Sequence, residues 1–112
     1  KQLAGFYAAH APLFASARPL DTPVNTSVAQ ITAGLTRQRD ITLLHLVNHN
    51  YQGGLLTQRT FTASFPYPEA PRRVTCHSPD AEAARPLAFR FANNTLTVAV
   101  DELAAYNLIV IE

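Results

Sequence analysis

The 112-residue chain carries a net charge of +1, and 47% of its residues are hydrophobic while only 15% are charged. This length suits one domain with a real core, and because the charged fraction lies below the usual quarter, part of the surface is expected to be covered by another domain, a subunit or polar side chains. The few basic residues are scattered and no apolar run approaches the ~20 residues of a membrane-spanning helix, so neither a nucleic acid nor a membrane is an expected partner.

The first predicted element is a helix over residues 2–15. Mostly apolar side chains recur there at spacings of three and four and form one stripe, which must pack on something: Leu3, Phe6, Tyr7, His10, Leu13 and Phe14. Because Pro12 cannot donate a backbone hydrogen bond, the helix is expected to kink or end near Ala11. The segment Ser16–Asn25 contains two prolines and is typical of an extended linker. The chain is therefore divided into a helix and linker over 1–25 and a β-domain over 26–112.

The stretch Ile41–Asn48 is the predicted centre of that domain. With period two, both of its faces are mostly apolar, which is typical of a strand covered on both sides and central in its sheet. A buried helix is the alternative interpretation. The β-branched residues at the ends of the run and the turn signals on either side favour the strand.

Further strands are predicted from alternating apolar residues. Phe89 is placed facing inward between Leu87 and Phe91, so Phe89→Ala is expected to cost roughly 3–5 kcal/mol. Asn93-Asn94 is a two-residue turn of the kind that tolerates positive φ. Seven short strands at about ten-residue spacing indicate an all-β fold, namely a Greek-key-like antiparallel sandwich of seven to eight strands after one short helix. Besides Ile41–Asn48 and the Leu87–Phe91 positions, these strands are Val28–Leu35, Thr60–Phe65, Arg73–His77, Leu96–Val100 and Tyr106–Ile111.

No reaction centre emerges from the sequence, and no cofactor is expected. Cys76 and His77 are adjacent and point to opposite faces of a strand, so Cys76 is interpreted as a small core residue. His45 and His49 lack further ligands nearby, so a metal site is not expected, and His45 is interpreted as a core histidine bonded to backbone. The acidic residues offer no obvious pair for glycoside hydrolysis, and Asp101-Glu102 is interpreted as a solvated turn.

Carbohydrate binding is the one ligand hypothesis that the residues suggest. Carbohydrate modules use exposed aromatic rings beside Asn and Gln donors, and the candidates of this kind are Asn48, Tyr51, Gln52 and Tyr67, with Phe65 nearby. The favoured alternative is that Tyr51 and Tyr67 pack over the sandwich ends with their hydroxyls in water. Tyr106 is interpreted as structural, with a buried ring and a hydroxyl bonded to nearby backbone at the corner before the last strand.

Three segments together resemble a known domain. The run Leu44–Asn48 followed by Asn50-Tyr51, the alternating strand Thr60–Phe65 and the closing segment Leu103–Ile111 resemble the C-terminal β-sandwich of multidomain glycoside hydrolases, dextranase-like enzymes and related barrel glycosidases among them. His49 interrupts the family's Asn-Tyr pattern, so the motif is not a literal match.

The resemblance implies a non-catalytic accessory domain that packs against and stabilises a catalytic barrel. Leu3–Phe14 looks like the last helix of such a barrel, and since the catalytic carboxylates of these enzymes lie on barrel strands, no position here matches them. The expected partner is the adjacent catalytic domain or a catalytic subunit. The alternative is a carbohydrate-binding module for oligo- or polysaccharide. The sequence contains no Met, so a fragment or processed product of a longer protein is expected.

Overall fold

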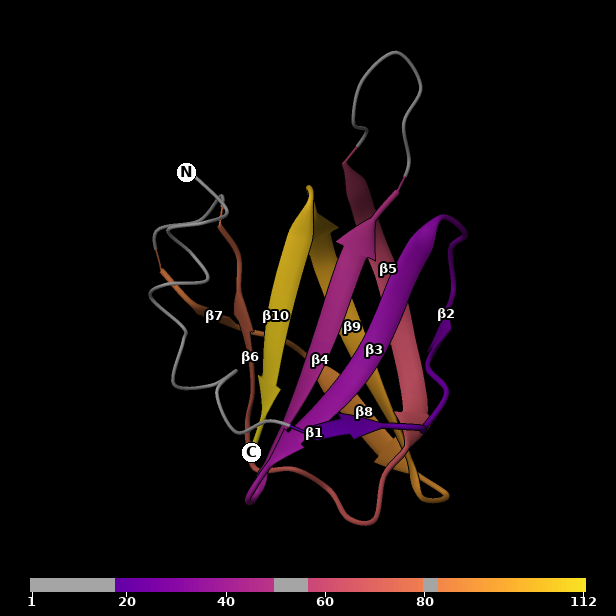
Figure 1. The fold of residues 1–112 in the computed structure, drawn as a ribbon, viewed down its shortest axis with the longest axis vertical. Helices are drawn as coiled ribbons and strands as arrows, with labels where there is room; N and C mark the ends of the chain where they lie inside the picture. Colours follow the sequence, from indigo (N-terminus) through magenta and orange to yellow (C-terminus); the bar gives the residue numbers. More distant parts are fainter. Residues whose placement is uncertain (1–17, 50–56, 80–82) are drawn as a thin grey trace.

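The computed structural model describes residues 18–49, 57–79 and 83–112, which form two antiparallel sheets facing each other (Figure 1). The larger sheet has the order β1-β3-β4-β10-β6-β7 and the smaller one β2-β5-β9-β8. The all-β expectation is confirmed, whereas the helix predicted over 2–15 lies outside the described residues. The strands are β1 Arg18–Leu20, β2 Asn25–Thr26, β3 Ile31–Gln38, β4 Ile41–Asn48, β5 Gln58–Pro66, β6 Val74–His77, β7 Arg85–Pro86, β8 Phe89–Ala92, β9 Thr95–Leu103 and β10 Tyr106–Ile111.

Strands β4 and β10 form the middle of the larger sheet. β4 pairs with β3 on one side and with β10 on the other, in a register that runs from Val47 opposite Tyr106 to Thr42 opposite Ile111. The bounds predicted from sequence, 41–48 and 106–111, are those observed. All six residues of β10 and most of β4 are buried. The central, two-sided burial expected for Ile41–Asn48 is therefore confirmed.

The main core lies between the two sheets. Each strand contributes alternate side chains to it, because successive residues of a strand point to opposite faces. Burying each large apolar side chain contributes roughly 1.5–3 kcal/mol, so this layer supplies most of the driving force for folding. The core includes Leu44, Leu46, Ile109 and Ile111 from the larger sheet and Phe61, Ala63, Phe65, Leu96, Val98 and Val100 from the smaller one.

The outer faces of the two sheets differ in character. On the larger sheet, a second buried cluster, here named the outer strip, consists of Leu43, Tyr106, Leu108 and Val110. On the smaller sheet, the outward positions Thr60, Thr62, Ala99 and Asp101 are exposed. The larger sheet is therefore buried along its middle on both faces, while the smaller sheet has one wet face.

Three short strands were missed because they carry too few residues for alternation to register. β1 lies within the predicted linker and pairs with β3, β2 follows it, and β7 lies at the end of the predicted loop Ser78–Arg85. β3 also starts later than expected and continues to Gln38, which leaves only Arg39-Asp40 as a turn, with Arg39 at φ 55°. Asn93 and Asn94 both have positive φ, which confirms the predicted turn between β8 and β9.

Phe89 corrects one energetic expectation. It lies opposite buried Val98 and so points toward the core side, as predicted. However, β8 is the edge strand of its sheet, and Phe89 remains 37% exposed. Phe89→Ala should therefore cost about 1–2 kcal/mol, less than the 3–5 kcal/mol of a fully buried ring. Among the described residues no helix is long and apolar enough to cross a membrane.

Candidate functional site

The predicted carbohydrate residues do not form one platform. Asn48 ends β4, whereas Tyr67 follows β5 and reaches Thr42 near the start of β4. Asn48 lies six positions along the strand from Thr42, which corresponds to about 20 Å along β4. Tyr51 and Gln52 lie outside the described residues. The candidates within the described ranges are thus divided between opposite ends of the sandwich.

Asn48 has a structural position at its end of the molecule. Its side chain is buried, and Nδ2 donates to the carbonyl oxygens of Ala104 at 2.7 Å and Leu103 at 3.3 Å. Its backbone amide donates to Ala105 O at 2.9 Å. These bonds tie the end of β4 to the turn between β9 and β10, so the amide that was a candidate sugar donor holds a corner of the fold.

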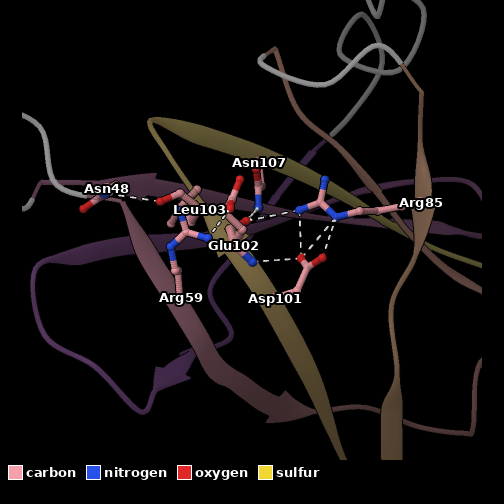
Figure 2. A network of polar contacts seen from close by, with 7 residues as sticks. All are labelled: Asn48, Arg59, Arg85, Asp101, Glu102, Leu103 and Asn107. Atoms are coloured by element: carbon pink, nitrogen blue, oxygen red, sulfur yellow. Dashed lines mark hydrogen bonds and ion pairs between the residues drawn. The ribbon is translucent and has the colours of Figure 1, made fainter.

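The same corner carries a polar network on its surface side (Figure 2). Arg85 from β7 makes a bidentate ion pair with Asp101 of β9, with a shortest distance of 2.8 Å, and Arg59 of β5 pairs with Glu102 at 2.8 Å. The hydrogen bond from Arg85 lowers the pKa of Asp101 below its usual range. Asn107 Nδ2, which is buried, donates to Glu102 O at 2.9 Å. The two acids expected as a solvated turn are therefore exposed strand residues paired with arginines.

His45 and Tyr106 form a second polar chain, on the outer face of the larger sheet. His45 Nδ1 lies 2.8 Å from the Tyr106 hydroxyl, and Nε2 lies 2.9 Å from Thr36 Oγ1. Burial lowers the pKa of His45, which favours the neutral ring. Sequence reasoning expected backbone partners for both residues, whereas these contacts are between side chains. Tyr106 is buried in the outer strip, in agreement with its predicted structural role.

Cys76 is a core residue, as expected. It is completely buried on the inner face of β6, and burial raises the pKa of its thiol to about 11. A thiol that stays protonated and has no access to solvent is a poor nucleophile. In the described ranges no three His, Cys, Asp or Glu side chains lie together as a metal site would require.

The described residue that best fits a ligand contact is Tyr67, which follows β5 and lines the same hollow as Glu112. The end of β5 and the C-terminus lie at the same end of the sandwich (Figure 1). Its ring packs edge to face on Phe65, with centroids 5.9 Å apart, and its hydroxyl donates to the buried Thr42 Oγ1 at 3.2 Å. Its backbone amide donates to Asn94 O at 2.9 Å. Tyr67 thus packs over a sandwich end as expected, but its hydroxyl is bonded to Thr42.

Beside Tyr67 lies a hollow of about 430 Å³, here named the end groove. Arg37 is fixed there because Nη1 donates to Thr42 Oγ1 at 2.8 Å, the same oxygen that accepts from Tyr67. Glu112 is held by a bidentate ion pair with Arg73 at 3.1 Å. The remaining wall contains the loop after Tyr67, which two prolines stiffen. The polar lining is Arg37, Asp40, Tyr67, Glu69, Arg72 and Glu112, and the rest is Ile41, Pro68, Ala70 and Pro71.

Sequence reasoning found only Tyr67 among these groove residues. Arg37 belonged to a predicted polar turn, and the hairpin register that places it opposite Thr42 was not known. Glu112 and Arg72 are 40 residues apart, and they meet because Arg72 N donates to Glu112 O beside the end of β10. The one available signal was the aromatic residue within Pro66-Tyr67-Pro68, which marks a rigid loop carrying a ring.

Comparison with known proteins gives a structural likeness but no sequence match. No protein-family model matches the sequence, and no curated protein matches it. Among solved structures, the chain is similar to α-L-fucosidase isoenzyme 2 from Paenibacillus thiaminolyticus, with a TM-score of 0.60 and 16% sequence identity. The match covers 80% of this chain and 15% of that enzyme, so the chain spans a small part of the enzyme's length. At this identity the likeness is one of fold: the sandwich described above resembles a portion of a glycosidase.

Proposed function

We propose that this chain is a non-catalytic accessory β-sandwich of a glycoside hydrolase, placed C-terminal to a catalytic domain that it packs against and stabilises. The observation that carries the proposal is the fold similarity to a fucosidase. The match covers only 15% of the length of that enzyme. The sequence resemblance to C-terminal sandwiches of barrel glycosidases supports the same reading independently. The small share of that enzyme that the match covers supports an accessory role.

The layer structure supports packing against preceding polypeptide. The outer strip is buried although the smaller sheet covers only the opposite face of the larger one. β1, the first described strand, is an edge of this same larger sheet, so the described part of the chain begins there. Preceding polypeptide can therefore reach the outer face of the larger sheet without crossing the sandwich. We infer that this is the side that faces the catalytic domain.

The chemistry of the described residues supports a non-catalytic role. Glycoside hydrolysis needs one carboxyl group that is protonated and poised to donate. Asp101 is held ionised by Arg85, and Glu102 is paired with Arg59. In the end groove, Glu112 forms an ion pair with Arg73 at 3.1 Å. Each of these three carboxylates is paired with an arginine, which is not the setting of a carboxyl group poised to donate a proton.

The direct experiment uses the polypeptide that contains this chain together with its upstream sequence. We expect the long form to hydrolyse a 4-nitrophenyl glycoside, with 4-nitrophenyl α-L-fucoside as the first substrate tested. The 112-residue chain alone should be inactive, and removal of the sandwich should lower the thermal midpoint of the remainder. Hydrolysis by the purified chain that disappears in Asp101→Asn would contradict the proposal, and so would a remainder whose midpoint does not change.

A further inference from the structure

The end groove is built from polar groups that are already fixed in position. Thr42 Oγ1 accepts from both Arg37 and Tyr67, so one buried hydroxyl sets the places of a guanidinium and an aromatic ring. The edge-to-face contact with Phe65 limits rotation of the ring, and Arg73 fixes the carboxylate of Glu112. Groups that are held before binding lose little conformational entropy on binding, which favours affinity at a shallow site.

The charges in the groove balance. Arg37 and Arg72 are cationic, Asp40 and Glu69 are anionic, and Glu112 is neutralised by its partner Arg73. An anionic ligand would be attracted by the arginines but repelled by the carboxylates. A cationic ligand would be attracted by the carboxylates and repelled by the arginines. A ligand whose groups both donate and accept hydrogen bonds can use both kinds of residue, and sugar hydroxyls do so.

The groove continues past Tyr67. A second hollow, of about 340 Å³, also has Tyr67 in its lining. Its lining residues are Pro66, Tyr67, Pro68 and Asn94. Two hollows that meet at Tyr67 and Pro68 suit a ligand with two or more linked units. The edge-to-face contact with Phe65 occupies at most one face of the Tyr67 ring. Tyr67 is half-buried, so part of its side chain is open to solvent and can contact the apolar side of a sugar ring.

We propose that the end groove binds a neutral oligosaccharide, with Tyr67 contacting a sugar ring and Arg37, Arg72 and Glu69 bonding its hydroxyls. This goes beyond the accessory role and does not depend on it. The site lies at the opposite end of β4 from Asn48 and uses only Tyr67 of the residues selected from sequence.

The test is a titration of the ¹⁵N-labelled 112-residue chain, followed by NMR, with maltose, cellobiose and lactose as neutral probes and D-glucuronate as the anionic probe. At concentrations up to roughly 50 mM, at least one disaccharide should shift the amides of residues 37–42, 67–72 and 112, with a Kd on the order of 1 mM. Shifts confined to the Asn48 end, shifts with glucuronate alone, or no shifts with any probe would each overturn the proposal.

Variants locate the site and separate binding from folding. Arg72 is exposed and, within the described ranges, its side chain has no bonding partner, so Arg72→Ala should leave the fold intact and weaken the best disaccharide about tenfold. Arg90→Ala is the matched control, because Arg90 is equally exposed but lies on β8, outside the groove. It should change the Kd less than about twofold. Equal effects of the two variants would contradict the assignment of the groove.

Discussion

The outer faces of the two sheets show how one sequence rule produces two surfaces. The outward positions of β4 and β10 carry Leu43, Leu108 and Val110, all buried, whereas those of β5 and β9 carry Thr62, Thr97 and Ala99, which are exposed or half-buried. Both sheets bury their inner faces to similar extents. The difference teaches that the larger sheet is buried on both faces along its middle, and that a strand apolar on both faces marks such a position.

The largest predicted effect is a difference in unfolding free energy between side-chain truncations on the two outer faces. Leu108→Ala leaves a cavity in the outer strip and should lower the free energy of unfolding by about 2–5 kcal/mol. Thr62→Ala, on the exposed face of the smaller sheet, should change it by no more than about 0.5 kcal/mol. Urea denaturation of both variants measures this. Similar losses in the two would mean that the faces do not differ as described.

A smaller effect is expected for the polar chain beside the outer strip. Tyr106→Phe removes the hydroxyl 2.8 Å from His45 Nδ1 and keeps the buried ring, so it should cost about 1 kcal/mol. A double-mutant cycle with His45→Gln should assign most of that cost to the pair. If the losses in unfolding free energy of the two single variants simply add up in the double variant, the contact does not contribute to stability.

How much of this could be read from the sequence depends on the range of the contacts involved. Ile41–Asn48 was predicted with its bounds and its central place because two apolar faces are a local property of eight residues. The contact of His45 with Tyr106 was not predicted, because these residues are 61 positions apart in the sequence. They meet only through the pairing register of β4 with β10, which the spacing of residues along the sequence does not reveal. Phe89 was given the correct face, but its exposure depends on β8 being an edge strand, which follows from the sheet order.

The candidate site was less predictable still. Tyr67 was selected from the sequence for its aromatic ring. No sequence pattern pointed to Arg37, because its position depends on the pairing of β3 with β4 and on its hydrogen bond to the buried hydroxyl of Thr42. Asn48 was selected as a donor because Asn is common in sugar sites. The structure places its amide on the carbonyls of Leu103 and Ala104, contacts that require the β9–β10 turn to be folded.

The half-buried His45 should make stability depend on pH. Its pKa is lowered in the folded state, so on acidification below about pH 6.5 the unfolded chain takes up a proton that the folded chain resists. Stability is therefore full above that pH and declines as the pH falls toward the folded pKa. Asp101 acts separately, because its lowered pKa places its effect at more acidic pH. Denaturation at pH 7.5 and 5.5 should show a smaller decline in His45→Gln than in the parent, and an identical decline would contradict this assignment.

The smallest expected effect concerns the rim of the larger sheet's outer face. Gly34 on β3 is exposed, and a Cβ added there would meet no atom of the described residues within 4 Å. Gly34→Ala should therefore raise the free energy of unfolding by about 0.5 kcal/mol, because the substitution restricts the unfolded chain without a clash. A loss of stability in thermal denaturation would show that the covering of the outer strip extends over β3.

Thiol labelling of two matched variants tests the asymmetry of the outer faces most directly. Val110→Cys places a thiol in the outer strip, and Ala99→Cys places one on the exposed face of β9, while buried Cys76 of the parent gives the background rate. With a chromogenic disulfide reagent, Cys at 99 should react as an accessible thiol does. Cys at 110 should react at least about a hundredfold more slowly, because reaction there requires local opening. Equal rates at the two positions would contradict the account that the larger sheet is buried on both faces along its middle.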